Sequence, residues 1–83
     1  MSIRSDVSTQ LADYVEKFRA LADLTRVEII CLLRERGELC VCDLTEYLGG
    51  DQSRISYHLR ILRDAGLMYG RTMASTRMYS VRS

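Results

Sequence analysis

Glycines and a capping aspartate divide the second half of the chain into two short helices joined by a tight turn. The first of these helices is predicted over residues 41–48 and ends at Gly49-Gly50, because glycine adopts the backbone angles that terminate a helix. Asp51 is a good N-cap for the second helix, which Gly66 stops. Residues 41–65 are therefore predicted to form a helix-turn-helix.

Two further helices are predicted ahead of this motif. Apolar residues recur at three- and four-residue intervals over residues 8–22, which is the period of an amphipathic helix whose apolar stripe must be buried. A second helix begins near Asp23 or Thr25, both suitable N-caps, and Gly37 ends it. We expect residues 1–7 to form a flexible N-terminal tail.

The last part of the chain predicts a β-hairpin, or wing, over residues 67–81. Its two strands are expected over residues 67–72 and 77–81, on either side of a short loop. Residues 1–83 are thus predicted to form a single domain that is mainly α with a small β-hairpin wing. This fold is a winged helix-turn-helix with the element order α-α-α-α-β-β.

The composition is that of a small folded protein. Hydrophobic residues make up 47% of the 83 residues and charged residues 28%, which argues against a disordered chain. A core this small is marginal alone, so we expect a partner chain to add buried surface. No apolar run approaches the roughly 20 residues that a membrane span needs, and residues 1–7 lack the apolar stretch of a signal peptide. We therefore expect a cytoplasmic protein with no membrane partner.

The formal net charge of +1 conceals an asymmetry along the chain. Residues 1–51 contain six basic and ten acidic residues, whereas residues 52–83 contain six arginines against Asp64 alone. An arginine-rich segment with aromatic residues interleaved suits contact with DNA phosphates and insertion into a groove. A charged face that is merely solvated is the alternative interpretation.

The second helix of the predicted motif presents a polar, donor-rich face. Ile55, Leu59 and Leu62 fall at i, i+4 and i+7 and so face the core, which leaves polar residues on the opposite side. In helix-turn-helix proteins the start of this helix reads base edges in the major groove. The candidates for such contacts are Gln52, Ser53, Arg54, Ser56 and Tyr57.

Four more residues are candidates for contact with DNA. Arg60 is expected to meet a phosphate, and His58, the single histidine, is expected to be structural or to meet a phosphate. Arg71 and Arg77 flank the wing loop, where they can bracket a minor groove or its phosphates. Two such subunits would face half-sites about one or two DNA turns apart, so the expected partner is double-stranded operator DNA with an imperfect inverted repeat.

Two cysteines one residue apart, Cys40 and Cys42, lie at the start of the predicted motif. The three cysteines of the chain form no disulfide framework, and a reducing cytosol keeps them as thiols. Thiolates suit soft ions and not Mg²⁺ or Ca²⁺. Residues i and i+2 of a regular helix project about 200° apart, so both can reach one ion only if the segment distorts. Such a distortion would act on the helix that positions the reading helix and would lower DNA affinity.

Three stretches resemble the ArsR/SmtB family of small winged-helix, metal-responsive repressors. They are LADLTR at residues 21–26, ELCVCDL at 38–44 and QSRISYHLRIL at 52–62. The resemblance implies a homodimeric transcriptional repressor, and not an enzyme, that leaves its operator when arsenite or antimonite binds the thiolates of Cys40 and Cys42. It implies no organic cofactor.

The chain departs from the family's arsenical branch at Thr45, where the best-known repressors have a third cysteine. Trivalent arsenic prefers three sulfur ligands, so the third is left open between Cys31, the partner chain, a cellular thiol, and water or hydroxide. Cys31 lies in an apolar run, where a cysteine is expected to be a small buried hydrophobe. Related cadmium and lead sensors add cysteines from an N-terminal arm, and residues 1–10 contain none. This favours arsenite, with cadmium or lead as the alternative.

A second departure concerns the family's usual C-terminal helix, which pairs across the dimer. Only Arg82 and Ser83 follow Val81 in this sequence. We therefore expect the dimer to rest mainly on the first predicted helix.

Other classes of function compete with the metal-responsive repressor. A repressor that responds to thiol oxidation would have the same fold, although a disulfide between residues i and i+2 would be strained. A protein-interaction module that has lost DNA binding is a further alternative. No Gly-rich phosphate loop, paired acid and base or Cys–His nucleophile arrangement indicates an enzyme.

Overall fold

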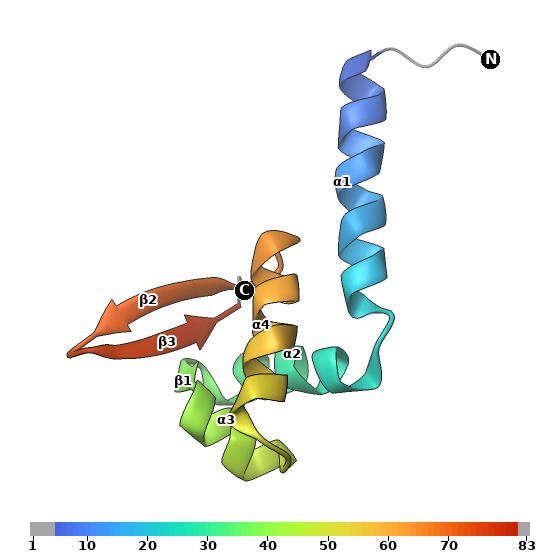
Figure 1. Ribbon diagram of the computed structural model, residues 1–83. Helices are drawn as coiled ribbons and strands as arrows, with labels where there is room; N and C mark the ends of the chain where they lie inside the picture. The colour runs from blue at the N-terminus through green and yellow to red at the C-terminus, as the bar shows by residue number, and fades with distance from the viewer. Residues whose placement is uncertain (1–4, 82–83) are drawn as a thin grey trace.

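The computed structural model describes residues 5–81 as four helices and a three-stranded antiparallel sheet (Figure 1). In chain order the elements are α1 (Ser5–Leu21), α2 (Leu24–Arg36), β1 (Leu39–Cys40), α3 (Val41–Leu48), α4 (Gln52–Asp64), β2 (Tyr69–Met73) and β3 (Thr76–Ser80). Helices α3 and α4 form the helix-turn-helix, and β2 and β3 form the wing. The predicted winged helix-turn-helix is therefore confirmed, with one strand added.

Aspartates cap the two helices for which the sequence predicts them. The carboxylate of Asp23 accepts a hydrogen bond from the backbone N–H of Arg26 at 3.1 Å, and that of Asp51 accepts one from Arg54 at 2.8 Å. Each bond satisfies a backbone donor that has no partner within the first turn of the helix. Asp23, and not Thr25, is thus the N-cap of α2.

Helix α1 begins earlier than predicted. It starts at Ser5, so residues 5–7 are helical and the expected tail over residues 1–7 is wrong for that part. Residues 1–4 lie outside the described residues. The apolar spacing marks only the part of a helix that needs an apolar face, and residues 5–7 extend the same helix without that signal.

The core lies where α2, α3 and α4 meet. Ile29 and Leu33 of α2, Leu44 of α3 and Leu59 and Leu62 of α4 are each at most 1% exposed. Burying one such side chain stabilises the fold by about 1.5–3 kcal/mol, so together they fix the angle between α3 and α4. The two helices of the motif are therefore held against each other by a shared buried core.

The added strand, β1, connects the cysteine segment to the wing. It pairs antiparallel with β3, with Leu39 opposite Tyr79 and Cys40 opposite Met78, and the sheet has the order β1-β3-β2. Two residues are too few to show the alternation by which a strand is recognised in a sequence, which is why β1 was not predicted.

The wing is a tight hairpin with its strands shifted from the predicted positions. Ala74 and Ser75 form the turn with φ values of 50° and 70°, the left-handed conformation that suits a two-residue hairpin. The strands therefore continue through Met73 and Thr76. Met68, predicted to lie in the first strand, precedes it and is 2% exposed in the core.

Helix α1 extends away from the other helices, on the opposite side from the wing in Figure 1. Its end joins the core through Ala20, which is 3% exposed. The predicted apolar stripe, in contrast, is not buried within the chain: Leu11, Tyr14, Val15 and Phe18 are 46%, 58%, 49% and 71% exposed. Spaced at three and four residues, these side chains form one continuous apolar face.

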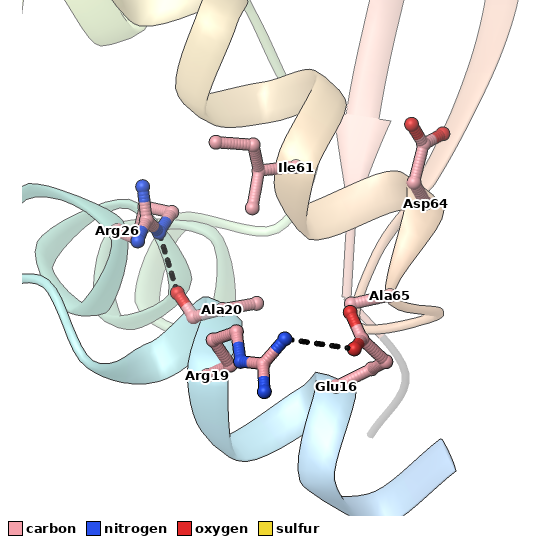
Figure 2. A pocket seen from close by; sticks show the side chains of 7 residues that line it. All are labelled: Glu16, Arg19, Ala20, Arg26, Ile61, Asp64 and Ala65. Carbon is pink, nitrogen blue, oxygen red and sulfur yellow. Dashed lines mark hydrogen bonds and ion pairs between the residues drawn. The ribbon is translucent and has the colours of Figure 1, made fainter. Parts of the chain in front are cut away.

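A hollow of about 340 Å³ lies between the end of α1 and helices α2 and α4 (Figure 2). Arg26 Nε donates a hydrogen bond to the carbonyl oxygen of Ala20 at 2.6 Å, which ties α2 to the end of α1. Arg19 pairs with Glu16 at 3.3 Å. The lining contains no sulfur ligand, so this hollow does not suit a thiophilic ion. Over residues 5–81, none of the helices combines the length and the apolar character needed to cross a bilayer.

Candidate DNA interface and thiol site

Helix α4 is the predicted DNA-reading helix, and its exposed side is the polar face that the sequence predicts. The side chains of Ile55, Leu59 and Leu62 are buried as predicted, which fixes which side of α4 faces outward. All the major-groove candidates and Arg60 are exposed. A hollow of about 450 Å³ runs along this face, and its lining consists of Gln52, Ser53, Ser56, Tyr57 and Arg60.

His58 does not belong to this exposed face, so its assignment as a DNA contact is wrong. It is 7% exposed, and its Nδ1 lies 3.1 Å from Arg26 Nη1 and 4.0 Å from Asp23 Oδ2. Arginine is always a donor, so Nδ1 must accept, and the imidazole is neutral with its proton on Nε2. Burial lowers the pKa of His58; Arg26 and Arg54 also lower it, and Asp23 opposes them. His58 is therefore a structural residue that links α4 to α2.

This burial predicts a loss of stability in mild acid. The unfolded chain takes up a proton on His58 near pH 6.5, whereas the folded chain does so only at lower pH, so the free energy of unfolding should decrease as the pH falls below about 6.5. The decrease amounts to about 1.4 kcal/mol for each unit by which the two pKa values differ. Urea unfolding at about pH 7.5 and pH 5.5 measures it.

The matched variant for this measurement is His58→Gln, which has no group that titrates in this window. Asp23 does not confuse the result, because its pKa is lowered from 3.8 by the backbone N–H of Arg26, and its contribution is lost only below pH 3.8. A pH dependence that is equally large in His58→Gln would show that another group causes it.

The two wing arginines differ in what surrounds them. Arg71 makes a bidentate pair with Glu38, with Nε 2.6 Å from Oε2 and Nη2 2.7 Å from Oε1. This hydrogen bonding lowers the pKa of Glu38 and raises that of Arg71. Arg77 is exposed, and its guanidinium lies over Gly70, where the absence of a side chain leaves it room. Arg77 is thus open to a phosphate, whereas Arg71 is already held by a carboxylate.

Cys40 is the N-cap of α3. Its Sγ accepts a hydrogen bond from the backbone N–H of Asp43 at 3.4 Å, and Asp43 Oδ2 accepts one from the N–H of Cys40 at 3.4 Å. The side chain is half-buried, and the residue also pairs with Met78 of β3. Cys40 therefore lies outside the helix, in extended backbone with φ −89° and ψ 171°.

Cys42 lies within the first turn of α3 and is exposed. Its Sγ accepts a hydrogen bond from Nε2 of Gln52, the first residue of α4, at 3.4 Å. The premise that both cysteines occupy one regular helix is thus wrong, because only Cys42 is helical. The 200° separation on a regular helix therefore does not apply to this pair. Each of the two sulfurs accepts a different hydrogen bond, Cys40 from Asp43 and Cys42 from Gln52.

Cys31 is exposed on α2, which contradicts the expectation that it is a buried hydrophobe. The apolar run around it is broader than one helix face, and the core takes Ile29 and Leu33 instead. Thr45, at the position of the family's third cysteine, donates its hydroxyl to the carbonyl oxygen of Val41 at 2.8 Å. Among residues 5–81, no three His, Cys, Asp or Glu side chains lie close enough together to hold a metal ion.

Three residues that contact the candidate site residues are not predicted from the sequence: Glu38, Asp43 and Arg26. One signal was present: Cys40 and Asp43 have the spacing of a capping box, in which a side-chain acceptor is followed three residues later by an acidic residue. Glu38 and Arg71 are 33 residues apart and Arg26 and His58 are 32 apart, and such pairs have no local signature.

An exposed reading helix next to a β wing defines a winged helix-turn-helix DNA-binding protein. Residues 23–69, more than half of the chain, match the family described as bacterial regulatory protein, arsR family. The chain therefore belongs to the ArsR family of transcriptional regulators, as its resemblance implied, and it is not an enzyme.

Two relatives are named as arsenical resistance operon repressors. The arsenical resistance operon repressor of Bacillus subtilis (strain 168) is 47% identical over 74 residues, which cover 89% of this chain and 70% of that protein. The repressor of the same name from Escherichia coli (strain K12) is 51% identical over 57 residues, covering 69% of this chain and 49% of the relative. The chain thus spans only part of each relative's length.

A solved structure has the same fold. It is the solution NMR structure of a homodimeric winged helix-turn-helix DNA-binding domain from Mycobacterium bovis, with a TM-score of 0.88 and 26% identity. The superposition covers 100% of this chain and 77% of that one. Similarity over the whole of the chain includes α1 as well as the motif and the wing.

Proposed function

We propose that the protein represses transcription by binding operator DNA as a homodimer, and that arsenite or antimonite releases it by binding the thiolates of Cys40 and Cys42. One observation carries the proposal: Cys40 pairs with wing strand β3, and Cys42 is hydrogen-bonded to Gln52 at the start of α4. An ion held by both sulfurs would act on both DNA-contacting elements at once. Such a protein acts in the cytoplasm, where its operator lies.

On DNA, α4 would enter the major groove with its exposed face toward the bases. Its first turns carry groups suited to base edges, and Arg60, farther along the same exposed face, would meet a phosphate. The wing would lie against the backbone or the adjacent minor groove through Arg77 and Arg71. Two copies related by a two-fold axis would read an imperfect inverted repeat. In this proposal residues 1–83 act as one winged helix-turn-helix domain.

Binding of an ion by Cys40 would remove the cap of α3. The sulfur keeps lone pairs when it bonds an ion, but the new bond would turn them away from the N–H of Asp43, and loss of an N-cap typically costs a helix about 1 kcal/mol. Because α3 has only 8 residues and leads into α4, loosening its first turn would weaken the position of the reading helix. In this proposal the ion acts by breaking the N-cap of α3, and not by distorting a regular helix that contains both cysteines.

The names of the relatives support the class of ion. The Bacillus subtilis and Escherichia coli relatives are both arsenical resistance operon repressors. Two thiolates suit a soft ion, and the third position of trivalent arsenic would be filled by the partner chain, a cellular thiol, or water or hydroxide. Thr45 supplies no thiolate and donates its hydroxyl to the helix backbone.

Fluorescence anisotropy tests the proposal directly. Reduced protein is titrated onto its own upstream DNA, alone and with arsenite, antimonite, cadmium, lead or zinc. Release by arsenite or antimonite at concentrations where zinc has no effect is the expected result. Release by cadmium or lead alone would establish the alternative ion class, and tight binding indifferent to every ion would exclude the metal switch. Salt-dependent binding to this DNA would exclude the alternative of a protein-interaction module that has lost DNA binding.

A separate prediction concerns the Glu38–Arg71 pair. Glu38→Gln removes a negative charge beside the wing and frees Arg71 for a phosphate, so we expect DNA affinity to rise by a few-fold, about as much as one added phosphate contact gives. The slope of log affinity against log salt should steepen by about 0.9. Anisotropy titrations at several salt concentrations measure both. An unchanged slope would mean that Arg71 does not reach DNA even when released.

A further inference from the structure

We propose that Gln52 transmits the state of the Cys42 sulfur to the DNA-reading helix. The inference rests on the proposed function and names the contact through which that function is regulated. It makes Gln52 a positioning residue with two neighbours, the thiol on one side and the DNA base on the other.

The contact crosses from one helix of the motif to the other. Gln52 Nε2 donates to Cys42 Sγ at 3.4 Å, joining the first turn of α3 to the first residue of α4. The buried packing between these helices, such as that of Leu44 and Ile55, is apolar and does not respond to what binds a sulfur. The Gln52 amide responds directly, because its partner is the ligand atom itself.

The same side chain lines the exposed hollow on α4. Ser53, Ser56, Tyr57 and Arg60 complete that lining, which is the face offered to the major groove. A glutamine amide has two N–H donors and one carbonyl acceptor. With one N–H given to the sulfur, the second N–H and the carbonyl oxygen are the pair that reads an adenine edge.

The sulfur therefore orients the amide before DNA arrives. A side chain held in its binding geometry loses less entropy on binding, and this raises affinity. An ion bonded to Cys42 replaces the proton of the thiol, so the sulfur keeps its lone pairs, but the new bond reorients them and places a positive centre and its other ligands beside the amide N–H. Gln52 then loses its orienting partner, and its alignment with the base is lost with it.

Gln52→Ala in the full chain tests the link through the ratio of DNA affinities without and with saturating arsenite. We expect a ratio of about 10 to 100 for the unchanged protein and a ratio several-fold smaller for Gln52→Ala, in which only the route through the cap at Cys40 remains. Arsenite should still bind the variant, as measured by sulfur-to-arsenic absorption without DNA. Ser53→Ala, which changes the next residue on the same exposed face, should keep the full ratio. A full ratio in Gln52→Ala overturns the inference.

Alkylation separates this inference from the proposed function. In a Cys31→Ser/Cys40→Ser background, iodoacetamide forms a carbon–sulfur bond at Cys42 with loss of iodide and so occupies the sulfur without any ion. We expect alkylation to weaken DNA binding by about ten-fold when Gln52 is present and by less than about two-fold in Gln52→Ala. If no ion releases the protein but this difference is found, the proposed function fails and the link stands. Equal weakening in both proteins overturns the link.

Discussion

Replacing Cys42 with serine is expected to abolish release by arsenite while leaving DNA binding intact. In the unchanged protein the ratio of DNA affinities without and with arsenite should lie between about 10 and 100. In Cys42→Ser it should be about one, because one protein sulfur is lost from a site that has two. Serine retains an oxygen that accepts the Gln52 amide, so the reading helix keeps its orientation. Cys40→Ser should behave alike, since serine is itself a preferred N-cap and can replace the sulfur as acceptor for Asp43.

The control for this prediction is Cys31→Ser. Cys31 is exposed on α2, and the described part of the chain contains no cluster that brings it together with Cys40 and Cys42. Its replacement should leave the arsenite response unchanged, as measured by the same anisotropy titration. Loss of response in Cys31→Ser would make it the third ligand, contributed across a dimer. Full response in Cys42→Ser would remove the thiol pair as the sensor.

The parts of the fold that the sequence predicts correctly are set by local interactions. Asp23 and Asp51 each bond a backbone N–H three residues ahead, and such contacts depend on nearest neighbours alone. The buried side of α4 follows from the spacing of its aliphatic residues in the same way. The outward face, and with it the predicted groove-reading residues, is then fixed by exclusion.

The parts that the sequence does not predict depend on contacts between distant segments. The strand β1 exists because β3 pairs with it, and the bidentate hold of Glu38 on Arg71 requires the wing to fold back beside residue 38. His58 lies three residues after Ile55 and so on the core side of α4, but its partners Arg26 and Asp23 come from a distant segment. Cys31 shows the reverse, since an apolar run around a helix cannot all be buried when one face packs.

The thiol site combines both kinds of information. The pair of cysteines and its preference for soft ions can be seen in the sequence, but its geometry cannot. A cysteine used as an N-cap and paired with a wing strand is a different starting point from two cysteines on a helix. The structure therefore moves the expected effect of an ion from the helix body to its first hydrogen bonds.

Replacing Phe18, in the exposed apolar stripe of α1, with aspartate is expected to convert the proposed dimer to a monomer. Operator binding should weaken by about 100-fold. Phe18 is 71% exposed in the single chain, so a charge there costs the monomer little, whereas in a dimer it would be buried without a partner. Two linked readers bind an inverted repeat far more tightly than one, because the second contact is intramolecular. Sedimentation velocity and anisotropy on the full repeat measure the two effects.

A single half-site distinguishes loss of dimerisation from loss of the fold. On half-site DNA the Phe18→Asp variant should bind as well as the unchanged protein, since Phe18 is exposed and does not belong to the outward face of α4 or to the wing. Ala12→Asp, which adds the same charge to the same helix outside the apolar stripe, should remain a dimer and keep its affinity. If Phe18→Asp still sediments as a dimer, α1 does not hold the two chains together. Unaltered binding to the full repeat by a monomeric variant would mean that one subunit is enough to repress.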